Sequence, residues 1–392
     1  MKRKVYMDHS ATTPLASEVL EAMEPYLKET FGNPNSIHAW GREARKAVSE
    51  ARNKIAELIN GEAREIIITG GGSEADNLAI KGSAFALQDK GKHIITSAIE
   101  HHAVLDTCDW LQKMGFEVTV LPVDSNGIVD LEELKRSIRN DTILVTIMYA
   151  NNEVGTIQPV KEIINIAKER GVRVHLDGVQ AVGHIPVDVK ELNVDLMTLS
   201  AHKMYGPKGV GALYVKKGTK LVPLVHGGGQ EYNLRSGTEN TAGIVGFGAA
   251  SELAKSRLGN GEHLKEAQLR DKLLSGIMKK IPHAHITGHP TQRLPFHASV
   301  CFDFIEGESL LLRLDAEGIG ASSGSACTSG SLEASHVLLA MGISHERAHG
   351  SLRLTLGKDT TEEDIDYILE ILPKVVEDLR ALSPLGKDMN KR

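Results

Sequence analysis

The sequence predicts an α/β protein built around a mostly parallel sheet, and three observations lead to that prediction. Short apolar runs rich in β-branched residues recur between residues 65 and 215. Longer amphipathic stretches separate the first of these runs, and this alternation is typical of consecutive β-α-β units. Finally, a chain of 392 residues with only 4% aromatic residues is expected to have an aliphatic core divided between more than one domain.

The predicted strands are short and apolar along their whole length, as expected of strands buried on both faces of a parallel sheet. They cover residues 65–69, 93–97, 117–121, 143–148, 172–176, 195–199 and 210–215. Amphipathic stretches at residues 74–88, 103–114 and 160–170 are the predicted helices between them.

A polar, glycine-containing stretch at residues 255–261 interrupts the helical pattern, and a smaller α+β unit is expected after it. Its predicted elements are helices at residues 262–281, 308–317 and 361–382 and strands at residues 298–304 and 351–356. Acidic residues open the last helix, where they favour a helix N-terminus. We therefore predict a large α/β domain of residues 15–258 and a small α+β domain of residues 1–14 and 259–392.

Composition narrows the function classes. Lys and Arg number 45 against 51 for Asp and Glu, so no strong basic field is available for nucleic acid or an anionic membrane. No run of about 18 apolar residues and no signal-peptide pattern occurs. The three cysteines, Cys108, Cys301 and Cys327, form no C-x-x-C pair, which favours a reducing compartment. We expect a cytoplasmic protein.

Polar residues follow five of the predicted strands directly. The carboxyl ends of parallel strands meet at one edge of a sheet, and ligands bind outside that edge. One shared site is therefore expected there, built from Gly70 to Ser73, Glu100 to His102, Asn151 and Asn152, Asp177 to Gln180, and Ser200 to Lys203.

The residue types at these strand ends favour pyridoxal phosphate. Three glycines, Gly70 to Gly72, followed by Ser73 at the start of a predicted helix suit a single phosphate group, although a plain tight turn is the alternative. The run matches neither the dinucleotide fingerprint nor the P-loop. Lys203 is either solvated or able to form a Schiff base. Asp177 ends an apolar strand, where a protonated pyridine nitrogen would balance its charge.

Several motifs resemble the NifS/IscS-type cysteine desulfurases, which are fold-type-I pyridoxal-phosphate enzymes of aminotransferase class V. The resemblance runs over nearly the whole chain. It rests on Ala11 to Pro14, Gly32 to Pro34, Glu74 to Asn77, Glu100-His101, Asn151 to Gly155, Ser200 to Gly209, Arg235 to Thr238 and Ser325 to Gly330. The resemblance implies a mostly parallel seven-stranded sheet with flanking helices, and a smaller α+β domain that carries the catalytic cysteine loop.

The resemblance also implies roles for matching residues. Lys203 would bind the cofactor as a Schiff base, Asp177 would pair with its ring nitrogen, Gln180 would donate to its phenolic oxygen, and His101 would stack on the ring and move protons. The phosphate would be held by Gly72, Ser73, Ser200 and His202, with Thr238 reaching in from the second subunit of a homodimer. Asn152 and Arg353 would hold the substrate, and Cys327 would be the nucleophile.

The implied reaction takes sulfur from L-cysteine, gives L-alanine, and leaves a persulfide on Cys327 for iron–sulfur cluster assembly or tRNA thiolation. The partner would be an iron–sulfur scaffold protein or another sulfur acceptor, and Cys327 could transiently bind a nascent cluster. Three alternatives stay open: a selenocysteine or C–S lyase, a non-catalytic sulfur-assembly subunit, and a zinc hydrolase. The last rests on the H-E-x-x-H pattern of residues 345–349.

Overall fold

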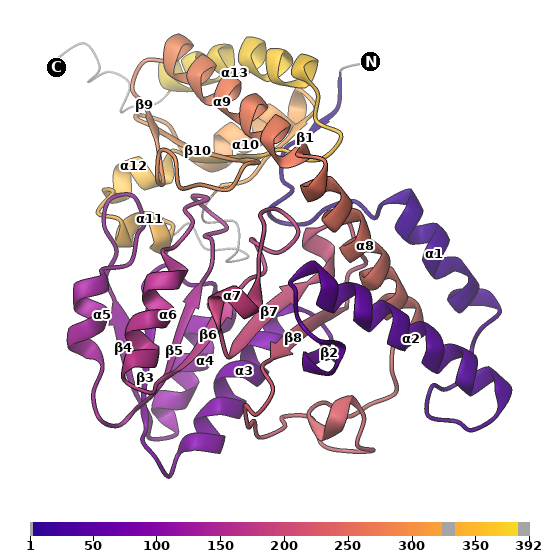
Figure 1. Cartoon of the computed structure of the whole chain (residues 1–392). Helices are drawn as coiled ribbons and strands as arrows, with labels where there is room; N and C mark the ends of the chain where they lie inside the picture. Colours follow the sequence, from indigo (N-terminus) through magenta and orange to yellow (C-terminus); the bar gives the residue numbers. More distant parts are fainter. Residues whose placement is uncertain (1–2, 324–333, 383–392) are drawn as a thin grey trace.

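A seven-stranded sheet forms the centre of the protein in the computed structural model, which describes residues 3–323 and 334–382 (Figure 1). Its strands lie in the order β2-β8-β7-β6-β5-β3-β4. Their bounds are β2 (Ile66–Thr69), β3 (His93–Ser97), β4 (Glu117–Leu121), β5 (Thr142–Met148), β6 (Arg173–Asp177), β7 (Leu196–Ser200) and β8 (Gly211–Val215).

One strand of this sheet runs against the others. β8 pairs antiparallel with both β2 and β7, whereas β3, β4, β5, β6 and β7 pair parallel. Consequently β2 points the same way as β3, β5, β6 and β7. The five strand ends that carry polar residues therefore meet at one edge, which confirms the mostly parallel sheet expected from the sequence.

Helices cover both faces of the sheet. Ile94 of β3 packs into a cluster with Ile80 and Leu111 from the helices α3 and α4, while its neighbour Ile95 belongs to the main core with Ile163 of α6. Adjacent strand residues point to opposite faces, so the unbroken apolar runs reflect burial on both sides. These helices are α3 (Gly72–Leu87), α4 (His102–Lys113), α5 (Leu131–Ser137), α6 (Val160–Glu169) and α7 (Val189–Leu192).

Three further helices pack together beside the β2 end of the sheet: α1 (Ser17–Lys28), α2 (Ala39–Leu58) and α8 (Thr241–Gly259) (Figure 1). The first two were not predicted from the sequence. The buried face of α2 is made largely of alanine, at Ala44, Ala47 and Ala51. Small side chains on this face allow close packing against α8.

A second, smaller sheet lies next to the first, with antiparallel order β12-β10-β9 (Figure 1). A short parallel pair, β1 with β11, lies alongside. The bounds are β1 (Val5–Tyr6), β9 (Ala284–Ile286), β10 (His297–Phe302), β11 (Ile319–Gly320), β12 (Ser351–Thr355), α9 (Glu262–Lys280), α10 (Gly307–Ala316), α11 (His336–Ala340), α12 (His345–His349) and α13 (Glu362–Leu382). Three short 3₁₀ turns complete the described elements, at Ala63–Glu65, Ala201–Lys203 and Glu231–Asn233.

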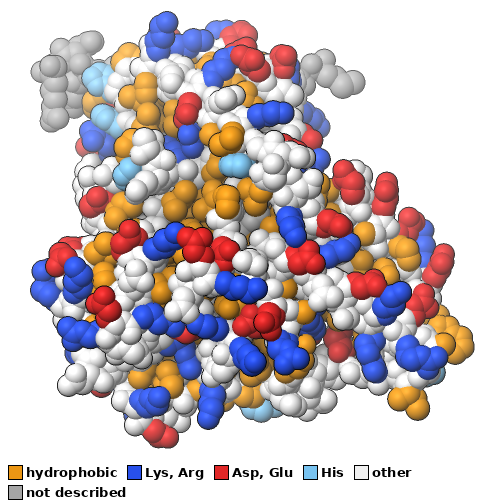
Figure 2. Space-filling view, viewed as in Figure 1, with side chains coloured by type: hydrophobic (Ala, Val, Ile, Leu, Met, Phe, Trp, Pro, Cys, Tyr) orange, Lys and Arg blue, Asp and Glu red, His pale blue; other side chains and the backbone are white. Residues whose placement is uncertain are grey.

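The predicted strands and helices agree with these bounds to within two residues. The predicted break came a few residues early, because α8 continues to Gly259 and α9 starts at Glu262. The division into two domains stays a prediction. No described helix is long and apolar enough to cross a membrane. On the face shown in Figure 2, basic and acidic side chains are interspersed rather than separated into fields.

Candidate active site

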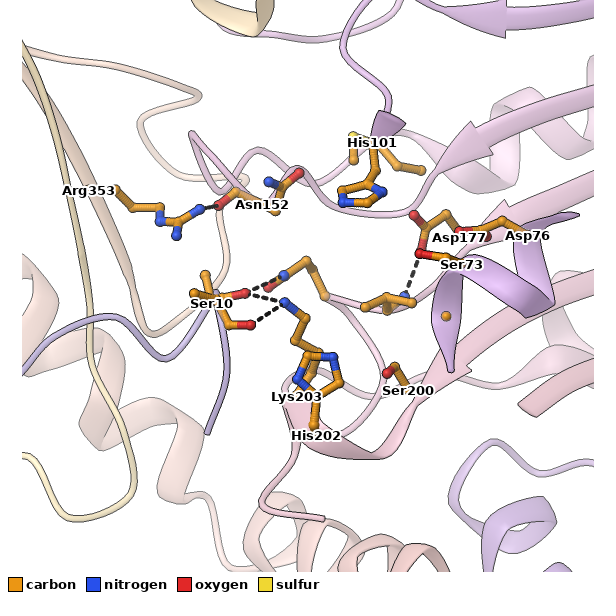
Figure 3. A pocket seen from close by; sticks show the side chains of 15 residues that line it. Ser10, Ser73, Asp76, His101, Asn152, Asp177, Ser200, His202, Lys203 and Arg353 are labelled. Atoms are coloured by element: carbon orange, nitrogen blue, oxygen red, sulfur yellow. Dashed lines mark hydrogen bonds between the residues drawn. The ribbon is translucent and has the colours of Figure 1, made fainter. Parts of the chain in front are cut away.

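A cavity of about 280 Å³ lies at the edge of the sheet where the five polar strand ends meet (Figure 3). Its walls contain every predicted cofactor and substrate residue except Thr238. The lining residues are Ser10, Ala11, Gly72, Ser73, Asp76, His101, Met148, Asn152, Asp177, Val179, Gln180, Ser200, His202, Lys203 and Arg353. Residues that lie as far apart in the sequence as Ser10 and Arg353 therefore line the same cavity.

One end of the cavity suits a phosphate group. Gly71 precedes α3 with a φ of 153°, a conformation that favours glycine. Gly72 and Ser73, the first two residues of α3, line the cavity, and the N–H groups of a first helical turn are suited to bind an anion. A Cβ at Gly72 would come 3.0 Å from a side-chain carbon of Val179, which is closer than an ordinary contact, so this position favours glycine. Ser200 Oγ is buried without a hydrogen-bond partner among the described residues, and a phosphate oxygen would satisfy it.

Asp177 lies at the end of β6, where it is buried. Burial raises the pKa of its carboxyl, while the Val179 N–H, donating at 3.0 Å, and the nearby His101 and Lys203 act in the opposite direction. A cation beside Asp177 would stabilise its ionised form. A protonated pyridine nitrogen is such a cation, so Asp177 fits the predicted role.

Lys203 follows β7 in the 3₁₀ turn Ala201–Lys203. Its Nζ donates to the carbonyl oxygens of Ser10, at 2.5 Å, and Ala11, at 2.8 Å (Figure 3). Gln180 Nε2 donates to the same Ser10 oxygen at 3.0 Å. The two carbonyls therefore hold the amine of Lys203 at the cavity, and the side chain does not extend into solvent.

Two histidines face the cavity as neutral rings. His101 caps α4, and its Nδ1 accepts the Ala103 N–H at 3.1 Å, so the neutral ring carries its proton on Nε2. Burial lowers the pKa of His101. For His202, burial and then Lys203 and Lys208 lower the pKa to about 4. In this tautomer His101 can donate the proton on Nε2, and it can accept a proton at Nδ1 only by releasing the Ala103 N–H.

Arg353 comes from β12 and is almost fully buried, with 3% of its side chain exposed. It donates through one terminal nitrogen to the Asn152 carbonyl at 2.9 Å and through the other to Asp8 at 2.8 Å. A guanidinium has five N–H donors, so further donors are left for a carboxylate.

The structure places one predicted site residue, Thr238, away from the cavity. Thr238 is exposed and outside the cavity. Its segment is tied to the phosphate end, because Arg235 pairs with Glu74 at 2.8 Å and Glu74 accepts the Gly70 N–H at 2.8 Å. Cys327, the predicted nucleophile, lies outside the described residues.

Sequence reasoning assigned no individual role to five of the lining residues. Ser10 and Ala11 contribute backbone carbonyls, and a backbone contribution cannot be recognised from the residue type. Met148 and Val179 are apolar and carry no functional group that would single them out. Asp76 could have been found, because it lies four residues after Gly72 and so on the same face of α3. It is buried, and burial together with the charge of Asp177 raises its pKa well above the usual value.

The alternative zinc site has little structural support. The H-E-x-x-H pattern forms α12, which is only five residues long. Within residues 3–323 and 334–382, no group of three His, Cys, Asp or Glu side chains is arranged to hold a metal ion. Cys108 and Cys301 are buried, and burial raises the pKa of each to about 12, so both are inert packing residues.

The fold and this cavity together define a pyridoxal-phosphate enzyme of fold type I. Residues 5–368 match the aminotransferase class-V family. The chain is 58% identical over 383 residues to the cysteine desulfurase IscS of Methanosarcina thermophila, covering 98% of this chain and 94% of that protein. It is 56% identical to the cysteine desulfurase IscS of Dictyoglomus turgidum, over the full length of both.

Solved structures agree. A NifS-like protein is 43% identical with a TM-score of 0.90, over 96% of this chain and all of the other. A NifS-like protein from Rickettsia africae is 33% identical with a TM-score of 0.86, over the same shares of the two chains. The chain belongs to the IscS/NifS-type cysteine desulfurase family, and pyridoxal 5'-phosphate is its cofactor.

Proposed function

We propose that this chain removes sulfur from L-cysteine, releases L-alanine, and keeps the sulfur as a persulfide on Cys327. The observation that carries the proposal is the convergence of Lys203, Asp177 and Arg353 on one cavity (Figure 3). An amine, a buried carboxylate and a buried guanidinium are the groups needed to bind an amino acid to this cofactor and to activate its α-carbon.

The reaction balances without an external oxidant. The substrate C–S bond breaks and an S–S bond to Cys327 forms. The electron pair of the C–S bond stays on carbon, which gains a proton and becomes the methyl group of alanine. The carbon is reduced and the two sulfur atoms share the oxidation, as in a disulfide.

Each residue of the cavity has a distinct task. Pyridoxal phosphate, when bound, withdraws electrons from the substrate α-carbon. Lys203 takes and returns the α-proton, and Asp177 keeps a proton on the ring nitrogen. Arg353 and Asn152 fix the substrate carboxylate and thereby orient the α-C–H bond. His101, neutral and protonated on Nε2, can move a proton beside the reacting sulfur.

Gly72, Ser73, Ser200 and His202 would hold the phosphate group, and Gln180 the phenolic oxygen. We further propose a homodimer in which Thr238 completes the phosphate site of the other subunit. Its exposure, on a segment fastened to the phosphate turn through Arg235 and Glu74, supports this role. The persulfide sulfur would pass in the cytoplasm to an iron–sulfur scaffold protein or to tRNA thiolation.

The test is incubation with L-cysteine and a thiol reductant, with alanine, sulfide and pyruvate measured together. Equal amounts of alanine and sulfide are expected. Pyruvate in place of alanine would contradict the proposal and identify a C–S lyase. Alanine formed from selenocysteine but not from cysteine would identify a selenocysteine lyase. The control is Lys203→Ala, which should form none of these products.

A further inference from the structure

A short N-terminal segment, residues 8–12, contacts four of the functional side chains. The Ser10 carbonyl accepts from Lys203 and Gln180, and the Ala11 carbonyl accepts from Lys203. Thr12 Oγ1 lies 3.1 Å from His202 Nδ1, and the carboxylate of Asp8 pairs with Arg353. Figure 3 shows the hydrogen bond that joins Lys203 to Ser10 at the wall of the cavity. Asp8 is the one member of this segment that contributes a charge.

The backbone fixes Asp8 beside the strand that carries Arg353. Asp8 forms a parallel bridge with Thr355, two residues beyond Arg353 on β12. The Thr355 N–H donates to Met7 O at 2.7 Å, and the Ser10 N–H donates to Thr355 Oγ1 at 3.0 Å. Tyr6 also donates its hydroxyl to the Asp8 carbonyl at 3.1 Å. These contacts fix the backbone of Asp8 against β12, so its short side chain starts from a defined position next to Arg353.

Two acceptors, the Asp8 carboxylate and the Asn152 carbonyl, hold the guanidinium of Arg353. Two of its donors are engaged, one by Asp8 and one by the Asn152 carbonyl, and its Nε is buried without a partner among the described residues. Asp8 is the only acid within ion-pair distance of Arg353 in the described part of the chain. Glu153 is close enough to interact with its charge, but Glu153 accepts its hydrogen bond from Ser335.

We propose that Asp8 is a positioning residue for the substrate carboxylate: it holds the Arg353 guanidinium so that the unused N–H donors face the cavity. This inference rests on the proposed role of Arg353. Bidentate recognition of a carboxylate needs a fixed fork, so a guanidinium that can rotate loses much of its selectivity. By holding the Arg353 fork in place, Asp8 would increase the preference of the site for ligands that carry a carboxylate.

Position and charge predict opposite effects, which makes the proposal testable. The negative charge of Asp8 repels an incoming carboxylate, whereas its oxygen holds the fork in place. Asp8→Asn keeps an acceptor oxygen and removes the charge, so carboxylate binding should stay the same or tighten. Asp8→Ala removes both, and Asp8→Glu keeps the charge but displaces it by one methylene, so both should weaken carboxylate binding.

The experiment compares two ligands of the holoenzyme, L-alanine and ethylamine, by spectroscopic titration. The dissociation constant of ethylamine divided by that of L-alanine isolates the contribution of the carboxylate, and a lower ratio means weaker carboxylate binding. Asp8→Ala should reduce that ratio about tenfold or more, the size expected for a hydrogen bond to a charged group. Asp8→Glu should reduce it as well, and Asp8→Asn should leave it within about threefold of wild type or raise it. The matched control is Asp141→Ala, which removes an exposed Asp–Arg pair of the same 2.8 Å length far along the chain.

Unfolding of the cofactor-free protein in urea gives a second readout. Removing the partner of a buried charge is destabilising. The urea midpoint should therefore fall in Asp8→Ala, recover in part in Asp8→Asn, and stay unchanged in Asp141→Ala. If Asp8→Ala does not fold, the ligand ratio in Asp8→Glu decides the question, because this variant keeps the charge.

Failure of this inference differs from failure of the Arg353 role. If Arg353→Gln lowers the ligand ratio while Asp8→Ala and Asp8→Glu leave it at the wild-type value, Asp8 has no positioning role. If Arg353→Gln keeps the wild-type ratio, Arg353 does not bind the carboxylate, and both ideas are wrong.

Discussion

The amine of Lys203 and the carbonyl oxygen of Ser10 lie 2.5 Å apart although 193 positions separate them in the chain. This contact joins the N-terminal segment to the end of β7. A carbonyl pair, from Ser10 and Ala11, gives the protonated amine a defined resting place inside the cavity. The same residues would receive the amine whenever it leaves the cofactor, which keeps it near the substrate.

Lys203→Ala should abolish the covalent bond between protein and cofactor. Borohydride reduction should then fix no cofactor to the variant, whereas in the wild type the label should appear on the Lys203 peptide. Far-UV circular dichroism should be unchanged, because Lys203 lies in a short turn outside the buried strands. Labelling of another lysine peptide in the wild type would refute the assignment.

Asp177→Asn should slow exchange of the substrate α-proton by orders of magnitude, and by more than it weakens substrate binding. An amide cannot balance a positive charge on the ring nitrogen, so electron withdrawal from the α-carbon is lost. NMR of deuterium exchange into bound L-alanine measures this step without sulfur chemistry. Exchange at the wild-type rate would show that Asp177 is not the partner of the ring nitrogen.

The parts of the site that come from strand ends could be predicted from sequence, because a parallel sheet places polar residues that follow its strands at one edge. Asp177, Asn152 and Lys203 are of this kind. The contributions of Asp8 and Ser10 could not be predicted, since a bridge to Thr355 across most of the chain places them and Ser10 acts through its backbone. Arg353 required the family resemblance, because its strand belongs to the second sheet.

Helices α1 and α2 were missed for a different reason. Both segments are amphipathic, but they precede β2, where the alternation of strands and helices that guided the prediction begins. Packing against α8 buries one face of each of these helices and adds to the strong helix preference of the α2 sequence.

Glu100→Gln should change how stability depends on pH. Glu100 is fully buried, accepts hydrogen bonds from Ser97 and the Met148 N–H, and burial raises its pKa from 4.5 to about 8. Between these two values the folded protein keeps a proton that the unfolded chain has lost. The contribution of Glu100 to stability is therefore full below pH 4.5 and is lost as the pH rises toward 8.

Each pH unit in this window is worth about 1.4 kcal/mol. Glutamine carries no such proton, so the unfolding free energy of Glu100→Gln relative to wild type should rise with pH by a few kcal/mol in total. Urea denaturation between pH 5 and 8 measures the difference. A difference that stays constant across this range would mean that Glu100 does not titrate there.

Mixing two inactive variants should restore activity if Thr238 acts across a dimer interface. In a hybrid of Lys203→Ala with Thr238→Trp, one site receives both defects and the other receives neither. With random exchange, half of the dimers are hybrids, so about a quarter of wild-type activity is expected. The control is the double mutant with both changes in one chain, taken through the same procedure without a second variant, because every site of its dimers carries both defects. No recovery after verified subunit exchange would place Thr238 outside the partner's site.

Cys327 separates a desulfurase from the other enzymes of this fold, although it lies outside the described residues. The cofactor activates the substrate carbon, but capture of sulfur needs a second nucleophile. A free cysteine has a pKa of about 8.5, so only about 3% is thiolate at pH 7. A hydroxyl group is a far poorer nucleophile toward sulfur. Among the groups that line the cavity, His101 is our candidate to take the thiol proton; it would do so at Nδ1, which must first release the Ala103 N–H.

Cys327→Ser should therefore bind the cofactor and still exchange the α-proton of L-alanine, yet form almost no alanine from L-cysteine. After exposure to L-cysteine, mass spectrometry of the wild type should find one added sulfur atom on the Cys327 peptide, removable by reductant. The α-proton exchange serves as the control, because it needs Lys203 and Asp177 but no thiol. If Cys327→Ser released alanine and sulfide at the wild-type rate, sulfur would leave without passing through Cys327, and the proposed persulfide mechanism would be wrong.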